Sequence, residues 1–239
     1  MAFLSPLLRA AVIGLFILSS ALALPTSTNL EKRDLPISFR STRPLTFYRA
    51  VTHPQEMNQM DHPHIVGSHP PPFPQIAGDF SAHGGYYMFA SREEALYWGN
   101  SFAALSSGRK FMIVELTYHA QALVPSSSIC SFPSGDINWQ RFVRTNQAHP
   151  PPAPPTCPLV EGPLSRTTRD QYVPAISAIT GQLMWQYAIV HPNWLSVVRI
   201  SSVQQFNVVP NWHHNPHVIP SSFARAGNWA RVCPGCQIQ

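Results

Sequence analysis

Groups able to carry acid–base or nucleophilic chemistry are sparse in this sequence. Its 239 residues include 11 carboxylates, 11 histidines and four cysteines. No G-x-S-x-G or H-E-x-x-H pattern occurs, so a serine-hydrolase elbow and a helix-borne zinc-protease site lack support. Glu93 and Glu94 could act as paired carboxylates in glycoside hydrolysis, but at the start of a helix such residues ordinarily cap it and compensate its dipole.

Two histidine-rich stretches contain residue types that bind metals. Their histidines are His62, His64, His69, His213, His214 and His217. Prolines interrupt both stretches, and neither has a helical or strand spacing that would aim two imidazoles at one point. We therefore expect loop histidines and no metal site.

The even number of cysteines predicts up to two disulfides in an oxidising compartment. Three pairings are possible, and we favour Cys130–Cys157, which would close a proline-rich segment, and Cys233–Cys236, which would form a tight C-terminal loop. Cys233-Pro-Gly-Cys236 also has the spacing of a redox motif or a zinc half-site. A redox motif needs a helix after it, and a zinc ribbon needs a second cysteine pair, and the sequence offers neither.

A strand and a short helix open the patterned part of the chain. Residues 45–51 are β-branched and aromatic, which predicts a strand with Arg49 near its end. A short helix at 54–57 follows. On these grounds Arg49 is either an ordinary surface arginine at a strand end or a ligand-binding residue.

A glycine-led strand and a longer helix form the second block. Residues 84–90 predict the strand, in which Tyr87 is either a core aromatic or a stacking residue. Ser91 and Glu94 predict a capping box at the helix start. Four apolar residues at helical spacing predict the buried face of the helix, namely Ala95, Trp98, Phe102 and Leu105.

The remaining segments predict a mixed α+β plan, because strands and helices do not alternate as in βαβ units. Further strands are expected at 111–118, 183–190 and 195–200, with a turn at 191–194 and a short helix within 137–143. A proline-rich insertion over about 120–170 would carry the first disulfide. Residues 34–239 suit one domain, which ends in a cysteine-containing tail.

The N-terminal residues predict export. Arg9 precedes an apolar run and a small-residue pattern ending at Ala23, which fits a signal peptide over 1–23. Lys32-Arg33 resembles a processing site of the fungal secretory route, so 24–33 would be a short propeptide. We expect a secreted, extracellular protein with no membrane segment after this removal.

Charged residues make up 11% of the chain, against about 25% in typical soluble proteins. The apolar fraction of 44% nevertheless excludes an electrostatically expanded, disordered chain. Loss of residues 1–33 would lower the net charge from +5 to +3, because three basic residues and one acidic residue are removed. The arginines are scattered rather than clustered, so no nucleic-acid partner is expected. A monomer is predicted.

Three segments resemble the enterotoxin-like ADP-ribosyltransferases. They are Phe47-Tyr48-Arg49-Ala50-Val51 with the helix after it, Gly85-Tyr86-Tyr87-Met88-Phe89-Ala90-Ser91 leading into a helix, and Trp185-Gln186-Tyr187-Ala188-Ile189-Val190 as the last catalytic strand. The resemblance spans roughly residues 45 to 200. It implies split mixed sheets, with a short helix after the first strand and a longer one after the second, and NAD as substrate without a metal.

The resemblance also implies roles for single residues. Arg49, Tyr87 and Ser91 would bind NAD, with Arg49 on the phosphates and Tyr87 stacked on nicotinamide. Gln186 and Tyr87 would occupy the catalytic positions, with Gln186 touching the nicotinamide ribose. The family has a glutamate where this chain has Gln186, and no Asp or Glu follows Asp170. A neutral amide cannot supply the charge that stabilises an oxocarbenium-like transition state.

Two functions follow from this comparison of residues. The chain is either a toxin-like enzyme that transfers ADP-ribose to a host protein or hydrolyses NAD, or a catalytically inactive secreted effector that binds a host protein. The segments around Arg49 and Tyr87 favour the first function. The absence of a late carboxylate favours the second.

Overall fold

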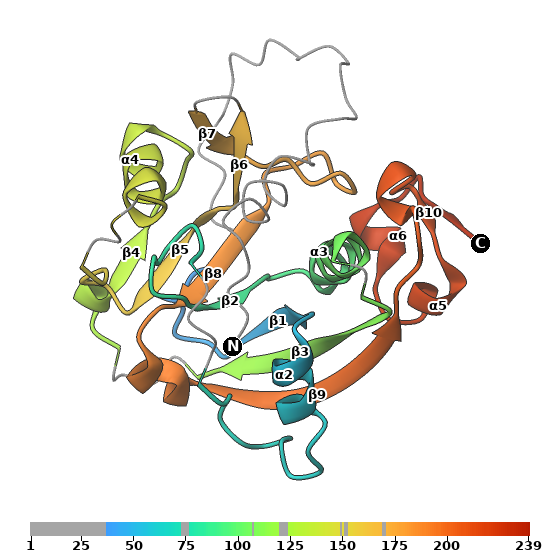
Figure 1. The fold of residues 1–239 in the computed structure, drawn as a ribbon, viewed down its shortest axis with the longest axis horizontal. Coiled ribbons are helices and arrows are strands. Elements are labelled where there is room, and N and C mark those ends of the chain that lie inside the picture. Colours follow the sequence, from blue (N-terminus) through green and yellow to red (C-terminus); the bar gives the residue numbers. More distant parts are fainter. Residues whose placement is uncertain are drawn as a thin grey trace.

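The computed structural model describes residues 37–72, 77–106, 108–119, 124–148, 150, 153–168 and 171–239. The predicted signal peptide (1–23) and propeptide (24–33) lie outside these residues. Two sheets of three and four strands face each other, and helices lie at their edges and outer faces (Figure 1). The predicted α+β class is confirmed.

The first sheet has three antiparallel strands in the order β1-β3-β9. They are β1 (Leu45–Val51), β3 (Lys110–Tyr118) and β9 (Val198–Asn207). The predictions for β1 and β3 are confirmed. The strand predicted at 195–200 starts later and runs further, because Pro192–Val197 forms a 3-10 helix before it.

The second sheet has the order β2-β8-β5-β4. Its strands are β2 (Tyr86–Met88), β8 (Trp185–Ile189), β5 (Leu159–Pro163) and β4 (Ile129–Ser131), and only β4 and β5 pair in parallel. The strands predicted at 84–90 and 183–190 are therefore present in shorter form. Tyr48 and Phe89 exchange two backbone hydrogen bonds of 2.8 Å, which link β1 of the first sheet to the end of β2.

The proline-rich segment at about 120–170 differs from the predicted insertion, because it supplies two strands of the second sheet. All five residues of β5 are buried, and β5 lies between β8 and β4. β6 (Ser165–Thr168) and β7 (Gln171–Pro174) then form a separate two-stranded sheet. The predicted Cys130–Cys157 disulfide is confirmed and ties β4 to the residues before β5.

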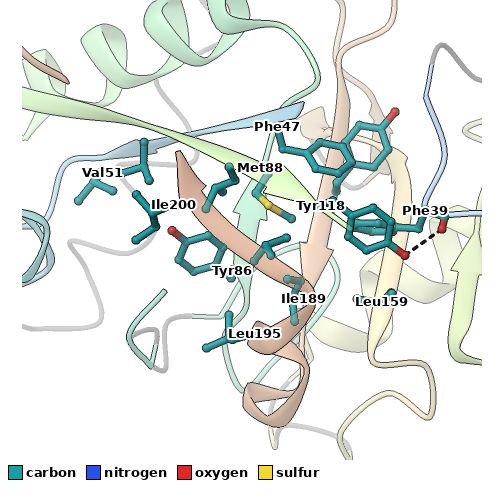
Figure 2. Packing of buried hydrophobic residues seen from close by; sticks show 14 of the residues in the cluster. Phe39, Phe47, Val51, Tyr86, Met88, Tyr118, Leu159, Ile189, Leu195 and Ile200 are labelled. Carbon is teal, nitrogen blue, oxygen red and sulfur yellow. Dashed lines mark hydrogen bonds between the residues drawn. The ribbon is translucent and has the colours of Figure 1, made fainter. Parts of the chain in front are cut away.

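The main core lies between the two sheets (Figure 2). Phe47 and Tyr118 from the first sheet meet Tyr86 and Met88 from the second, and each is at most 1% exposed. Burial of such side chains stabilises the fold by about 1.5–3 kcal/mol each. Phe39 joins this core, and its carbonyl oxygen accepts a 2.9 Å hydrogen bond from the Tyr118 hydroxyl. Burial raises the pKa of Tyr118 to about 12.

Helix α3 (Arg92–Leu105) packs on the first sheet through a different face from the predicted one. Ala95, Leu96 and Gly99 are buried, whereas Leu105 is 37% exposed. A Cβ atom at Gly99 would lie 2.7 Å from Phe111 Cδ2 and 2.8 Å from Ala50 Cβ. The helix therefore approaches the sheet along its small residues.

The aromatic residues expected on that buried face lie at its side instead. Trp98 and Phe102 are half-buried, and their rings stack with centroids 4.9 Å apart. Ala95 of the predicted apolar face is therefore buried, whereas Trp98 and Phe102 form a partly exposed aromatic pair.

Two further helices complete the central part of the fold. Helix α2 (Pro54–Met60) follows β1 as predicted, and Pro54 occupies its first turn, where the missing N–H is tolerated. Helix α4 (Ile137–Asn146) starts at Asp136, whose carboxylate accepts from the amides of Asn138 and Trp139 at 2.9 and 3.1 Å. Helix α4 covers the outer face of the second sheet by packing Trp139 and its neighbours there.

The C-terminal segment after β9 lies beside α3 (Figure 1). It contains a 3-10 turn at Trp212–His214, β10 (Val218–Ile219), α5 (Ser221–Ala224), α6 (Trp229–Val232) and β11 (Gln237–Ile238). Its buried aromatics Trp212, Phe223 and Trp229 form a second core with Phe111 and Phe206 of the first sheet. The predicted Cys233–Cys236 disulfide closes this segment.

Candidate functional site

Arg49 is buried in a network of its own rather than exposed at a strand end. Its Nε and Nη2 donate to the two carboxylate oxygens of Glu56 at 2.7 and 2.9 Å, and Nη1 donates to the carbonyl of Tyr87 at 3.0 Å. The guanidinium lies 4.3 Å from the ring centroid of Tyr86, and Arg49 is 8% exposed. Burial alone would lower the pKa of Arg49, but the charge of Glu56 reverses this and the pKa is raised.

Tyr87 and Gln186 point to the other face of the second sheet. Tyr87 pairs with Ala188 across β2 and β8, and Gln186 lies two residues from Ala188, so alternation places their side chains on one face. The hydroxyl of Tyr87 accepts a 3.2 Å hydrogen bond from the amide of Phe80. Burial, with the charge of Asp79, raises the pKa of Tyr87.

Asp79 receives the side chain of Gln186 on that face. Its Oδ2 accepts from Gln186 Nε2 at 2.8 Å and from the amide of Ser165 at 2.6 Å, while Oδ1 accepts from Ser165 Oγ at 2.7 Å. Burial raises the pKa of Asp79 although these donors oppose the shift. Asp79 thus anchors the loop before β2 to β8 and β6. Sequence reasoning missed it because no pattern surrounds it.

Three of the four residues named from the family resemblance, Arg49, Tyr87 and Gln186, therefore do not share one cleft through their side chains. Arg49 lies against Tyr86 on the face between the sheets, and Tyr87 and Gln186 meet Asp79 on the face under α4. The structure brings together Tyr87 and Gln186, and it brings Arg49 to the backbone of Tyr87 alone.

Ser91, the remaining predicted binding residue, caps α3 and borders a cavity. Its Oγ accepts from the amide of Glu94 at 3.2 Å and donates to Glu93 Oε2 at 2.8 Å. The hydrogen bond from the Glu94 amide to the Ser91 hydroxyl confirms the first half of the predicted capping box. The carboxylate that contacts Ser91 belongs to Glu93 rather than to Glu94. The cavity has a volume of about 530 Å³ and is lined by Tyr48, residues 90–93, residues 225–228, Arg231 and Val232.

Positive charge dominates this cavity, which we call the arginine cavity. Arg92, Arg225 and Arg231 line it, against the single carboxylate of Glu93. Arg225 and Arg231 are exposed and form no ion pair with any residue that the structure describes. Sequence reasoning missed this group because its arginines come from segments more than 130 residues apart.

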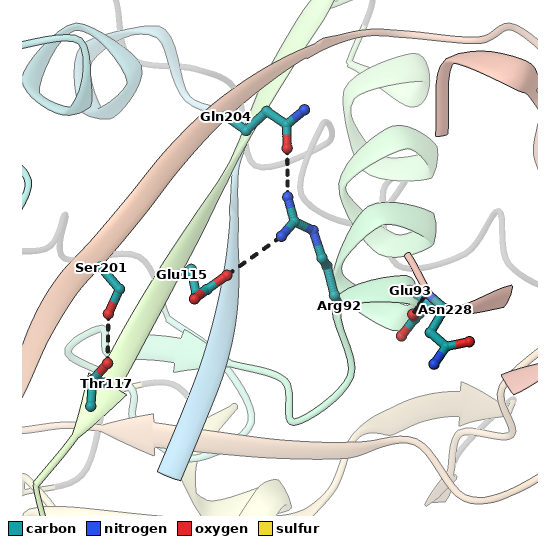
Figure 3. A network of polar contacts seen from close by, with 7 residues as sticks. All are labelled: Arg92, Glu93, Glu115, Thr117, Ser201, Gln204 and Asn228. Carbon is teal, nitrogen blue, oxygen red and sulfur yellow. Dashed lines mark hydrogen bonds and ion pairs between the residues drawn. The ribbon is translucent and has the colours of Figure 1, made fainter. Parts of the chain in front are cut away.

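Arg92 is held at the cavity edge by two partners on the first sheet (Figure 3). Its Nη1 lies 3.4 Å from Glu115 Oε2, and its Nη2 donates to Gln204 Oε1 at 2.5 Å. Its Nε is buried and has no hydrogen-bond partner among the described residues. A buried donor without a partner costs about 1–3 kcal/mol.

Glu93 and Glu94 fix the helix start to its surroundings. Glu93 Oε1 accepts from the amide of Asn228 at 2.5 Å, which ties the C-terminal segment to α3. Burial and the neighbouring charge of Glu93 raise the pKa of Glu94 to about 7. Both carboxylates are buried at the start of α3, and Glu93 also holds the C-terminal segment through Asn228.

Comparisons with known proteins add no assignment. No family model matches the chain, and no curated protein is significantly similar to it. None of the described helices is long and apolar enough to cross a bilayer.

Proposed function

We propose that the chain is a secreted, catalytically inactive binding protein on an ADP-ribosyltransferase-like fold. The observation that carries this proposal is the environment of Arg49. Glu56 and the Tyr87 carbonyl accept from three of the five N–H donors of this buried guanidinium, which leaves at most two for NAD phosphates. A bidentate arginine–carboxylate pair is among the stronger charge-assisted contacts in proteins, and a ligand would have to displace it.

The position of Gln186 supports the same proposal. Turnover of NAD would require negative charge near the nicotinamide ribose, and the amide of Gln186 carries none. Its Nε2 is engaged by Asp79 on the opposite face of the sheet from Arg49. ADP-ribosyl transfer and NAD hydrolysis are therefore less well supported than binding.

The arginine cavity provides the binding chemistry for this function. Guanidinium groups pair with phosphate and carboxylate oxygens in a fixed two-donor geometry. The exposed Arg225 and Arg231, which have no ion-pair partner among the described residues, favour an anionic ligand, and the half-buried ring of Tyr48 offers an apolar wall. We infer a phosphate-bearing ligand, either a small molecule such as NAD or a phosphorylated group on a host protein.

Calorimetric titration with pyrophosphate, NAD and a phosphoserine peptide, combined with chromatography of released nicotinamide, tests this proposal. We expect at least one phosphate-bearing probe to bind and no nicotinamide release above a protein-free blank. Arg225→Ala with Arg231→Ala should weaken binding by ~1.5- to 5-fold per arginine, with the smaller effect at high salt, because the charges are exposed. Arg166→Ala, an exposed arginine outside the cavity, is the matched control.

The results separate the alternatives. Nicotinamide release would establish an enzyme and overturn the proposal. Binding of NAD or pyrophosphate alone would identify a small-molecule ligand, whereas binding of the phosphopeptide alone would identify a protein partner. No binding by any of the three probes would eliminate the arginine cavity as the site.

Export is a separate part of the proposal. The disulfides Cys130–Cys157 and Cys233–Cys236 support an oxidising compartment. Mass spectrometry of protein secreted from a fungal host expressing the full chain should give Asp34 as the first residue. Retention in the cell, or an N-terminus that includes residues 1–23, would contradict it.

A further inference from the structure

His217 lies beside the C-terminal disulfide. Its Nδ1 is 3.6 Å from Cys233 Sγ and 3.7 Å from Cys236 Sγ, and the three atoms lie within 4.8 Å of one another. Cys233 is buried, Cys236 is partly buried and His217 is exposed, so the group is reachable from solvent. Nothing in the arginine cavity involves these side chains.

The backbone holds the three residues in register. Val218 and Ile219 of β10 pair in parallel with Gln237 and Ile238 of β11, and the amide of Gln237 donates to the carbonyl of His217 at 2.8 Å. His217 and Cys236, the residues just before the paired strands, are therefore side by side. The position of His217 depends on this pairing rather than on its exposed side chain.

The distances match those of a tetrahedral zinc centre. With Zn–S of about 2.3 Å and Zn–N of about 2.0–2.1 Å, a tetrahedral site separates nitrogen from sulfur by about 3.5 Å and the two sulfurs by about 3.8 Å. The two nitrogen–sulfur distances already have this value within ~0.2 Å. Only the sulfur–sulfur separation must change, and breaking the disulfide permits that change.

The imidazole also gains little from the disulfide itself. A disulfide sulfur is at best a weak acceptor and has no proton to donate, so two contacts near 3.6 Å contribute little hydrogen bonding. Two thiolates and one imidazole nitrogen, by contrast, are preferred zinc ligands. The sequence offered only Cys233 and Cys236 at zinc spacing, and the fold supplies His217 as the third ligand.

We propose that His217, Cys233 and Cys236 form a zinc site that opens when their disulfide is reduced. A dithiol reductant donates two electrons to the Cys233–Cys236 bond, and the reductant leaves as a disulfide. The two resulting thiols release their protons to solvent as Zn²⁺ binds. Three protein ligands leave the fourth position to water or to a ligand, as in open zinc sites.

Metal analysis of the full protein with and without reduction tests this proposal. After reduction by a phosphine and removal of excess metal, we expect one Zn²⁺ per chain, and none in the oxidised protein. Co²⁺ should give visible absorption bands typical of tetrahedral thiolate coordination. His217→Ala should weaken Zn²⁺ binding at least ~100-fold, because one of the three protein ligands is lost.

The phosphine also reduces Cys130–Cys157, whose thiols could bind metal. The double variant Cys233→Ser with Cys236→Ser is the matched control for this effect. This variant keeps the other pair and should bind no metal. The exposed His217 allows its variant to fold, and circular dichroism checks this. Reduced parent protein that binds no metal, or binding that survives either variant unchanged, would overturn the proposal.

Discussion

Replacement of Glu56 by glutamine tests whether Arg49 is a structural residue. The variant keeps the shape of the side chain and removes its charge, leaving the guanidinium buried without a counter-charge. Charges separated by ~4 Å at an effective dielectric of ~20 interact by ~4 kcal/mol, and removing one partner of a buried pair typically costs ~3–5 kcal/mol. We expect Glu56→Gln to fall in this range.

Urea unfolding followed by circular dichroism measures the loss, and a thermal scan checks it. For a domain of ~200 residues, a loss of ~3–5 kcal/mol lowers Tm by about 6–20 °C. The double variant Arg49→Met with Glu56→Leu should recover most of the stability, because apolar replacement of a buried pair is often neutral or favourable.

The Arg92–Glu115 pair is the matched control, since it is longer, at 3.4 Å, and its side chains are 22% and 29% exposed. Glu115→Gln should cost less than ~1 kcal/mol. If Glu56→Gln costs no more than Glu115→Gln, the pair does not hold Arg49, and the arginine is available to a ligand. That result would remove the main support for an inactive protein.

Three further predictions concern the packing and the charges of the fold. Gly99→Ala should destabilise the protein by ~1–3 kcal/mol in urea unfolding, because the new Cβ atom meets Phe111 and Ala50. This loss is expected despite the better helix propensity of alanine. Equal stability of the variant and the parent would show that α3 can shift away from the sheet. Because the pKa of Glu94 rises from 4.5 to about 7, the unfolded chain releases its proton first and stability falls as pH rises between these values. Glu94→Gln should match the parent near pH 4 and exceed its stability by ~3 kcal/mol at pH 8, and an unchanged difference across pH would contradict the burial of the charge. Replacing Cys130 and Cys157 by serine should lower the free energy of unfolding by ~3 kcal/mol without reductant, because the disulfide closes a loop of 27 residues. A loss below ~1 kcal/mol would show that this disulfide does not restrain the unfolded chain.

Sequence patterns were sufficient for strands and helices whose burial is visible in their own residues. β1 and β3 are rich in β-branched, aromatic and other apolar residues, and α2 has a proline at its start. β5 could not be predicted, because Leu159–Pro163 contains a charge, a glycine and a proline. Its burial depends on β8 and β4, which come from distant parts of the chain.

The buried face of α3 shows a second limit of local patterns. Large apolar residues at helical spacing suggested a buried stripe through Trp98 and Phe102, but close packing against β1 and β3 favours the small side of the helix at Gly99. How closely a helix can approach a sheet depends on the sizes of the side chains that both elements contribute to the contact. The hydrophobicity of the helix residues alone therefore predicted the wrong positions, Trp98 and Phe102, as the buried face.

The candidate sites were predicted only in part for the same reason. Cys233 and Cys236 were paired correctly, but His217 reaches them through the pairing of β10 with β11. Arg49 was recognised as a notable residue, yet its partner Glu56 lies in the next helix and gave no signal of its own. Side-chain partners across elements cannot be identified from the spacing within one element.

The scarcity of carboxylates explains how a chain with few charged residues forms a basic cavity. Glu56 pairs with Arg49, Asp79 holds Gln186, and Glu161 is fully buried and accepts from the amide of Phe39 at 2.8 Å. These acids are committed to fixing segments of the fold, so they are poorly placed to balance exposed arginines. Arg225 and Arg231 therefore keep their charge without an ion-pair partner among the described residues, which supports the proposed anion binding, and β8 has Gln186 in place of a carboxylate.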